Sequence, residues 1–146
     1  MYLSSEEAKL FFKLWLGLLS YTNQKYSVNP EITEMKSPKG LDIQKIGGIR
    51  NKLWENENVI DEYIEATGNL TEHEIQIISD WKNNRISGEF IIVKHLKNYS
   101  VFMNIEKPVN LYGVIGISNS ISEMIPSHAL PIYVNATLIP FERKII

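Results

Sequence analysis

Three histidines are the side chains of this sequence best suited to moving protons near neutral pH, because histidine alone has an unperturbed pKa in that range. They are His73, His95 and His128. The groups that a small hydrolase would need are a histidine base, an orienting carboxylate and a serine nucleophile: His95 or His128, Glu89 or Glu123, and Ser118 or Ser120. Serine-rich turns with one histidine are also ordinary loops, so the sequence assigns no catalytic residue and a hydrolase stays the third alternative for function.

The sequence contains no motif typical of a metal site, a reactive thiol or a phosphate-binding loop. There is no cysteine, which excludes disulfides, thiolate metal sites and a cysteine nucleophile. The histidines are too far apart in sequence for the usual paired zinc ligands. A metal-dependent nuclease needs a glutamate and a lysine on one face of a strand, whereas Glu89 and Lys94 would face opposite sides. The segment from Gly113 to Gly116 is not followed by the lysine and the serine or threonine of a phosphate loop. We interpret both residues as strand glycines that make room for a bend, a bulge or a crossing helix. We therefore expect no metal and no cofactor.

A second group of candidates is basic and surrounds an expected hairpin. It combines cations with one aromatic ring, the combination that binds single-stranded nucleic acid on a sheet. The candidate binding residues are Lys82, Arg85, Lys94, His95, Lys97 and Tyr99. Residues 81–146 hold 7 basic and 4 acidic residues, a mild excess that is far from a typical nucleic-acid footprint. The simpler interpretation is a solvated hairpin tip whose lysines protect an edge strand.

The elements that must position these side chains change in type along the chain. Capping boxes at Ser4 with Glu7 and at Thr71 with Glu74 predict helices over residues 4–26 and from residue 71 onward. Asp42 and Asn58 are expected to cap two further helices. A loop over residues 27–39 connects the first two helices.

Two further features concern packing in this helical half. Gly47-Gly48 inside the second helix predicts that another backbone packs very close to it. Trp15, Trp54 and Trp81 all lie on apolar helical faces, so we expect them in the core rather than stacked on a ligand.

After Arg85 the apolar period changes from 3.6 to 2, which predicts strands. We expect strands over residues 88–97, 99–104, 109–118, 130–139 and 141–146, with a short helical turn over 119–126. The first two strands should meet in a two-residue turn at Lys97-Asn98, where asparagine tolerates a left-handed backbone. In that register residue 94 pairs with 101 and residue 96 with 99.

Several blocks of the sequence, in this order, resemble a family of uncharacterised bacterial proteins. The blocks are residues 12–21 (FKLWLGLLSY), 54–63, Trp81-Lys82, 88–94 (GEFIIVK), Tyr112-Gly113-Val114 and 137–141 (TLIPF). The resemblance implies an N-terminal helical part and a C-terminal β part, and it carries no catalytic signature. Members of that family often continue past the equivalent of Ile146, which leaves open a longer natural chain.

The 146 residues thus predict a single α+β domain, with a helical part over 1–85 and a β part over 86–146. We expect about four helices packed on an antiparallel sheet of four to five strands, which could curl into a partial barrel. The function expected first is a non-catalytic interaction module that binds a protein partner or a second copy of itself, and nucleic-acid binding is the alternative. The acidic start and the absence of a long apolar stretch favour a cytoplasmic protein without membrane contact.

Overall fold

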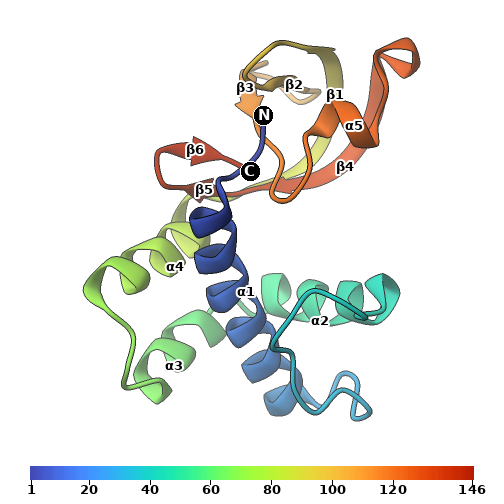
Figure 1. Cartoon of the computed structure of the whole chain (residues 1–146). Coiled ribbons are helices and arrows are strands. Elements are labelled where there is room, and N and C mark those ends of the chain that lie inside the picture. The colour runs from blue at the N-terminus through green and yellow to red at the C-terminus, as the bar shows by residue number, and fades with distance from the viewer. The chain divides into compact units, whose positions relative to one another are not determined.

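Helices fill the first part of the chain and strands the second, as the α+β interpretation requires (Figure 1). The computed structural model describes all residues from Met1 to Ile146. The helices are α1 (Ser5–Tyr26), α2 (Ile43–Glu55), α3 (Val59–Ala66), α4 (Glu72–Asn84) and the short α5 (Ile121–Met124). The strands are β1 (Ile86–His95), β2 (Ser100–Asn104), β3 (Leu111–Val114), β4 (Ile132–Leu138), β5 (Pro140–Phe141) and β6 (Lys144–Ile145).

The chain divides into two compact units. Residues Lys9–Lys82 form one, here called the helical unit, and Met1–Ala8 together with Asn83–Ile146 form the other, here called the β unit. The first eight residues therefore belong with the strands, because Leu3 N–H donates to the Gly116 carbonyl at 3.1 Å and Gly116 N–H donates to the Met1 carbonyl at 3.1 Å. No helix is both long and apolar enough to cross a membrane, and the cytoplasmic location stays a prediction.

Both predicted capping boxes are confirmed. Ser4 N–H donates to Glu7 Oε2 at 3.0 Å and Glu7 N–H to Ser4 Oγ at 3.2 Å. Thr71 and Glu74 make the same reciprocal pair, with both distances 3.1 Å. These bonds satisfy N–H groups that the first turn of a helix leaves without partners. Asn58, by contrast, precedes α3 without any capping bond from its side chain.

The core of the helical unit is aromatic. The rings of Phe11, Trp15, Trp54 and Trp81 form a connected cluster with centroid separations from 5.6 to 6.1 Å. Trp81 is fully buried, and the other two tryptophans are half-buried. Aromatic pairs at such separations contribute about 0.5–1.5 kcal/mol beyond their burial. The prediction that the tryptophans belong to the core is confirmed.

The loop between α1 and α2 is ordered by one buried amide. Asn23 is 4% exposed, and its Nδ2 donates to the carbonyls of Asn29 at 3.0 Å and Ile32 at 2.9 Å. Its Oδ1 accepts from Asn29 N–H at 2.8 Å. A single side chain therefore satisfies three backbone groups of the loop, which explains how a long connection without regular structure stays in place.

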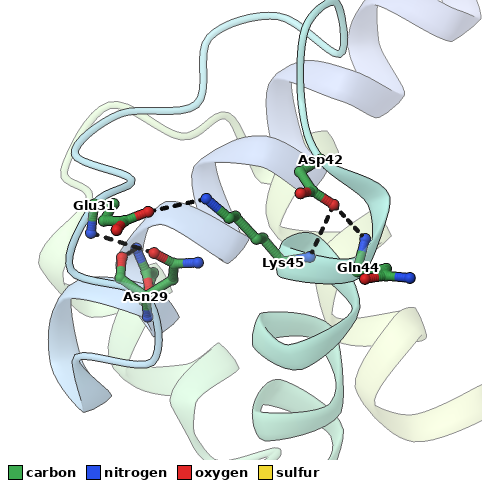
Figure 2. Close-up of polar contacts among 6 residues, drawn as sticks. Asn29, Glu31, Asp42, Gln44 and Lys45 are labelled. Carbon is green, nitrogen blue, oxygen red and sulfur yellow. Dashed lines mark hydrogen bonds and ion pairs between the residues drawn. The ribbon is translucent and has the colours of Figure 1, made fainter.

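Figure 2 shows how the same loop reaches the first turn of α2. Asp42 caps the helix as predicted, because its Oδ1 accepts from Gln44 N–H at 2.9 Å. Lys45, in that first turn, places its ammonium 2.9 Å from Glu31 Oε2. Glu31 N–H in turn donates to Asn29 Oδ1 at 3.2 Å. The Lys45 ammonium lowers the pKa of Glu31, and both groups are exposed, so the pair orients the loop more than it stabilises it.

No other backbone packs closely against the Gly47-Gly48 pair of α2, contrary to the prediction from the sequence. A Cβ at Gly48 would lie 3.8 Å from Val28 Cγ1, and one at Gly47 would lie 3.6 Å from an Arg50 nitrogen. Both are ordinary contacts, so the prediction of a closely packed backbone is wrong. The close approach occurs in α1 instead, where a Cβ at Gly17 would lie 2.4 Å from the Tyr63 hydroxyl.

The β unit contains one sheet of six strands in the order β4-β1-β2-β3-β6-β5. The expected antiparallel sheet of four to five strands is corrected in two respects: there are six strands, and β3 pairs with β6 in parallel. The outermost strands β4 and β5 are separated only by Ile139 in sequence. The sheet must therefore curl until its two edges approach, which gives the partial barrel seen in Figure 1.

The predicted last strand over 141–146 is in fact a tight hairpin. β5 and β6 pair antiparallel, with Phe141 opposite Lys144. The two turn residues, Glu142 and Arg143, have φ values of 48° and 63°, as a two-residue turn with the twist of the strands demands. The left-handed residues expected in the first hairpin occur here instead, since Asn98 does not have a positive φ.

Candidate functional site

The first hairpin has the predicted register. Lys94 lies opposite Val101, and Leu96 N–H donates to the Tyr99 carbonyl at 2.8 Å. The structure adds a bulge at Val93, where the pairing of β1 and β2 shifts by one residue. Lys94 and Lys97 are exposed on this hairpin. The local turn chemistry thus placed the basic residues correctly along the strands.

Three of the other predicted binding residues, Lys82, Tyr99 and Arg85, are engaged in contacts of their own. Lys82 Nζ lies 2.6 Å from Asp61 Oδ2 inside the helical unit. The Tyr99 ring lies against β3, because a Cβ at Gly113 would be 2.9 Å from Tyr99 Cδ2. The ring therefore covers a strand, and Gly113 makes room for this side chain rather than for the bend, bulge or crossing helix that was expected. Arg85, directly after α4, is half-buried and makes contacts of its own.

His95 is held at both ring nitrogens. Its Nδ1 lies 2.7 Å from Ser100 Oγ, and its Nε2 lies 2.7 Å from the backbone carbonyl of Ile125. A carbonyl can only accept, so Nε2 donates its proton to Ile125, while Nδ1 shares a hydrogen bond with the buried Ser100 hydroxyl. His95 thereby connects strand β1 to the residue that follows α5.

Ser120 and Glu123 form the capping box at the start of α5, whereas Ser118 takes no part in it. Glu123 Oε2 accepts from Ser120 N–H at 2.8 Å, and this bond lowers the pKa of Glu123. Ser120 Oγ lies 3.1 Å from Ser122 Oγ, and His128 is exposed in a short 3-10 turn. These contacts position α5, and the hydrolase hypothesis gains no support from them. No three His, Asp or Glu side chains lie close enough to hold a metal ion.

A pocket in the β unit is the feature that sequence reasoning missed. It has a volume of about 380 Å³ and is walled by the inner face of the curled sheet, by the segment after β3 and by α5. Its apolar lining consists of Ile92, Phe102, Val114, Ile115, Ile117, Ile121, Met124, Ile125, Val134, Leu138 and Ile146. Its other lining residues are Gly116, Ser118, Asn119 and Thr137, and none is charged. The frequent isoleucines over 115–125 were the available signal, but only the curling of the sheet brings them together with the strand residues.

The outer face of the same sheet is also apolar in part. Four residues lie opposite one another across four strands: Tyr133 on β4, Ile91 on β1, Met103 on β2 and Leu111 on β3. Tyr133 is 71% exposed and Leu111 is 65% exposed. Facing residues on neighbouring strands share one side of a sheet. They therefore form a continuous row, here called the outer row.

The row ends on a strand edge that is unpaired. β4 is hydrogen-bonded to β1 on one side only and is an end of the sheet order. Its seven residues, Ile132 to Leu138, contain no charge and no proline. Proteins usually protect such an edge with charges, proline or a bulge, and β4 has none of these within its length. Of the two strands that end the sheet, β4 has seven residues and β5 only two.

Comparison of the chain with protein-family models, with curated proteins and with solved structures finds no match. The resemblance to an uncharacterised bacterial family therefore stays a prediction. Function has to be argued from the geometry of the β unit itself.

Proposed function

We propose that this protein is a non-catalytic interaction module that self-associates through the free edge of β4. The observation that carries the proposal is the outer edge of β4, an uncharged seven-residue strand that ends the sheet and pairs with β1 on its other side only. Pairing two copies of that strand would satisfy its outward N–H and carbonyl groups. Residues 141–146, expected as one strand, form a short hairpin instead, which leaves β4 as the longer of the two strands that end the sheet.

The symmetry of a dimer fixes the register. A two-fold axis makes the interface identical on both copies, so full overlap of strand 132–138 requires antiparallel pairing centred on Asn135. Tyr133 then faces Thr137 of the second copy, and Asn135 faces its own counterpart. Two outer rows would lie on the same side of a continuous sheet, which extends the apolar surface that Tyr133 begins.

The expected association is weak. A pair of seven-residue strands covers much less than the roughly 1,200–2,000 Å² buried in stable interfaces. We therefore expect a monomer–dimer equilibrium that depends on concentration within the micromolar range, rather than a permanent dimer. In such an equilibrium the local concentration of the chain itself decides how much of it is dimeric.

Sedimentation velocity over a series of concentrations tests the proposal, with Asn135→Lys as the variant. Asn135 lies opposite Glu89 within the monomer, so the new lysine gains a cross-strand acidic neighbour there and faces a like charge only in the dimer. Asn98→Lys, at the exposed hairpin tip, is the matched control. We expect wild type and Asn98→Lys to associate and Asn135→Lys to stay monomeric.

A wild-type chain that is monomeric at every concentration would contradict the proposal, and so would an Asn135→Lys variant that associates like wild type. The alternative of nucleic-acid binding through the mildly basic C-terminal half stays a prediction. It requires binding of a labelled single strand that weakens steeply as salt rises. The contacts of Lys82 with Asp61 and of Tyr99 with Gly113 do not favour it over self-association.

A further inference from the structure

The pocket inside the curled sheet is built to hold its shape. One of its walls is α5 with the residue after it, and this wall is fixed at both ends. The Ser120–Glu123 capping box fixes its start, and the His95 ring fixes its end through the Ile125 carbonyl at 2.7 Å. The side chains of Ile121 and Ile125 line the pocket from this wall. The buried Ser100 holds His95 in the orientation that this requires.

The chemistry of the lining defines what would fit. No charged residue lines the pocket, and the side chains with polar groups are Ser118, Asn119 and Thr137. Apolar walls offer water few hydrogen bonds, so transfer of an apolar molecule from water to this surface is favourable. An ionised group would lose its hydration with no opposite charge to replace it. The volume of about 380 Å³ lies near the lower end of small-molecule pockets, which span roughly 300–1,000 Å³.

We propose that the β unit binds a small neutral apolar molecule, such as a medium-length aliphatic chain with an uncharged polar end, in the pocket between the sheet and α5. The aliphatic part packs against Ile92, Phe102 and Val114, and the uncharged end lies near Ser118 or Asn119. The proposal does not depend on the dimer, because the residues that decide it lie away from the outer row.

The test uses the full chain and the neutral fluorescent probe N-phenylnaphthylamine, which brightens when it leaves water. We expect saturable binding of the probe, displacement by octanol, and at least tenfold weaker displacement by octanoate. Ile117→Phe, in a half-buried bend of the pocket wall, should weaken probe binding at least tenfold by occupying the space. Ile105→Phe makes the same change at an exposed loop position outside the pocket and should leave binding unchanged.

A second variant keeps the test valid if the larger side chain disturbs the fold. Met124 lines the pocket but is 63% exposed, so Met124→Lys adds a charge at the rim with little risk to stability. It should weaken displacement by octanol while far-ultraviolet circular dichroism stays unchanged. Absence of saturable binding by the wild type would overturn the proposal. Equal displacement by octanol and octanoate would overturn the neutral class, and equal binding by Ile117→Phe, Met124→Lys and wild type would overturn the location.

Discussion

The helical unit and the β unit treat their apolar residues differently. Eleven large apolar residues of the chain are exposed, and ten of them lie in the β unit, while the helical unit exposes only Ile43. The helical unit gathers its largest side chains into one aromatic cluster. The β unit leaves an outer row, a free strand edge and an apolar pocket.

The difference follows from how the two kinds of backbone are satisfied. A helix pairs its N–H and carbonyl groups within itself, so a helical unit can finish its core by packing alone. A sheet that does not close completely must end in two edges, and each edge offers unpaired groups to a partner. The surfaces of this protein that are suited to binding therefore lie where the sheet ends and where it curls. Both proposed binding surfaces, the edge of β4 and the pocket, accordingly belong to the β unit.

The largest effect is expected at Gly116. A Cβ there would lie 1.7 Å from the backbone oxygen of Asn119, and a backbone atom cannot move aside as a side chain can. We expect Gly116→Ala to destabilise the β unit by about 3 kcal/mol or more, measured as faster amide exchange in β1 and β4. Gly113→Ala should cost less, since its neighbour is the Tyr99 ring. Equal stability of Gly116→Ala and wild type would contradict the packing described for the segment after β3.

The three tryptophans make the comparison sharper, because all of them lie between Lys9 and Lys82. Tryptophan fluorescence therefore reports the helical unit, while amide exchange reports both units. Following both signals in Gly116→Ala shows whether the two units unfold together or separately.

A smaller effect, dependent on pH, is expected at Glu74. The Lys13 ammonium, 2.6 Å from the Glu74 carboxylate, lowers the pKa of that buried group, and the Thr71 N–H adds to the effect although burial opposes it. A carboxyl with a lowered folded-state pKa stabilises the protein above its unfolded-state pKa, and this stability is lost as the pH falls through the folded-state pKa. Glu74→Gln should cost about 1–2 kcal/mol at neutral pH.

Urea unfolding followed by tryptophan fluorescence between about pH 6 and about pH 3 checks this prediction. The free energy of unfolding should fall less steeply with acidity in Glu74→Gln than in wild type, so that the two curves converge at the acidic end. Parallel curves would mean that the Lys13–Glu74 pair contributes nothing to the pH dependence.

The smallest effect is expected to be stabilising. Gly48 is exposed in the interior of α2, and a Cβ there would make only an ordinary contact with Val28. Gly48→Ala should therefore raise the free energy of unfolding by about 0.5–1 kcal/mol through helix propensity. Gly17→Ala, the same change in α1, should lower the free energy of unfolding, because the added Cβ would lie 2.4 Å from the Tyr63 hydroxyl. A lower free energy of unfolding in Gly48→Ala than in wild type would contradict this packing and would support the close approach predicted from the sequence.

Features set by neighbouring residues could be predicted from the sequence. The capping boxes at Ser4 and Thr71 and the cap at Asp42 depend on side chains two or three residues away, and the register of the first hairpin depends on its turn. Features set by distant pairing could not. Nothing near residue 114 indicates that it lies beside residue 145 in parallel, and the pocket exists only because that pairing curls the sheet. The prediction of close packing at the glycine pair in α2 was wrong for the same reason, since tertiary packing decides which residues lie next to it.

Pairing of β4 with its own copy around Asn135 can be measured directly, because the chain contains no cysteine. In an antiparallel strand pair centred on residue 135, the two Cα atoms would lie about 4.5–5.5 Å apart, within the range that a disulfide bridges. Asn135→Cys should therefore form an intermolecular disulfide under mild oxidation much faster than Asn98→Cys, an exposed thiol at the hairpin tip. The excess should grow with protein concentration until the dimer saturates. Equal rates of disulfide formation in the two variants would contradict the account.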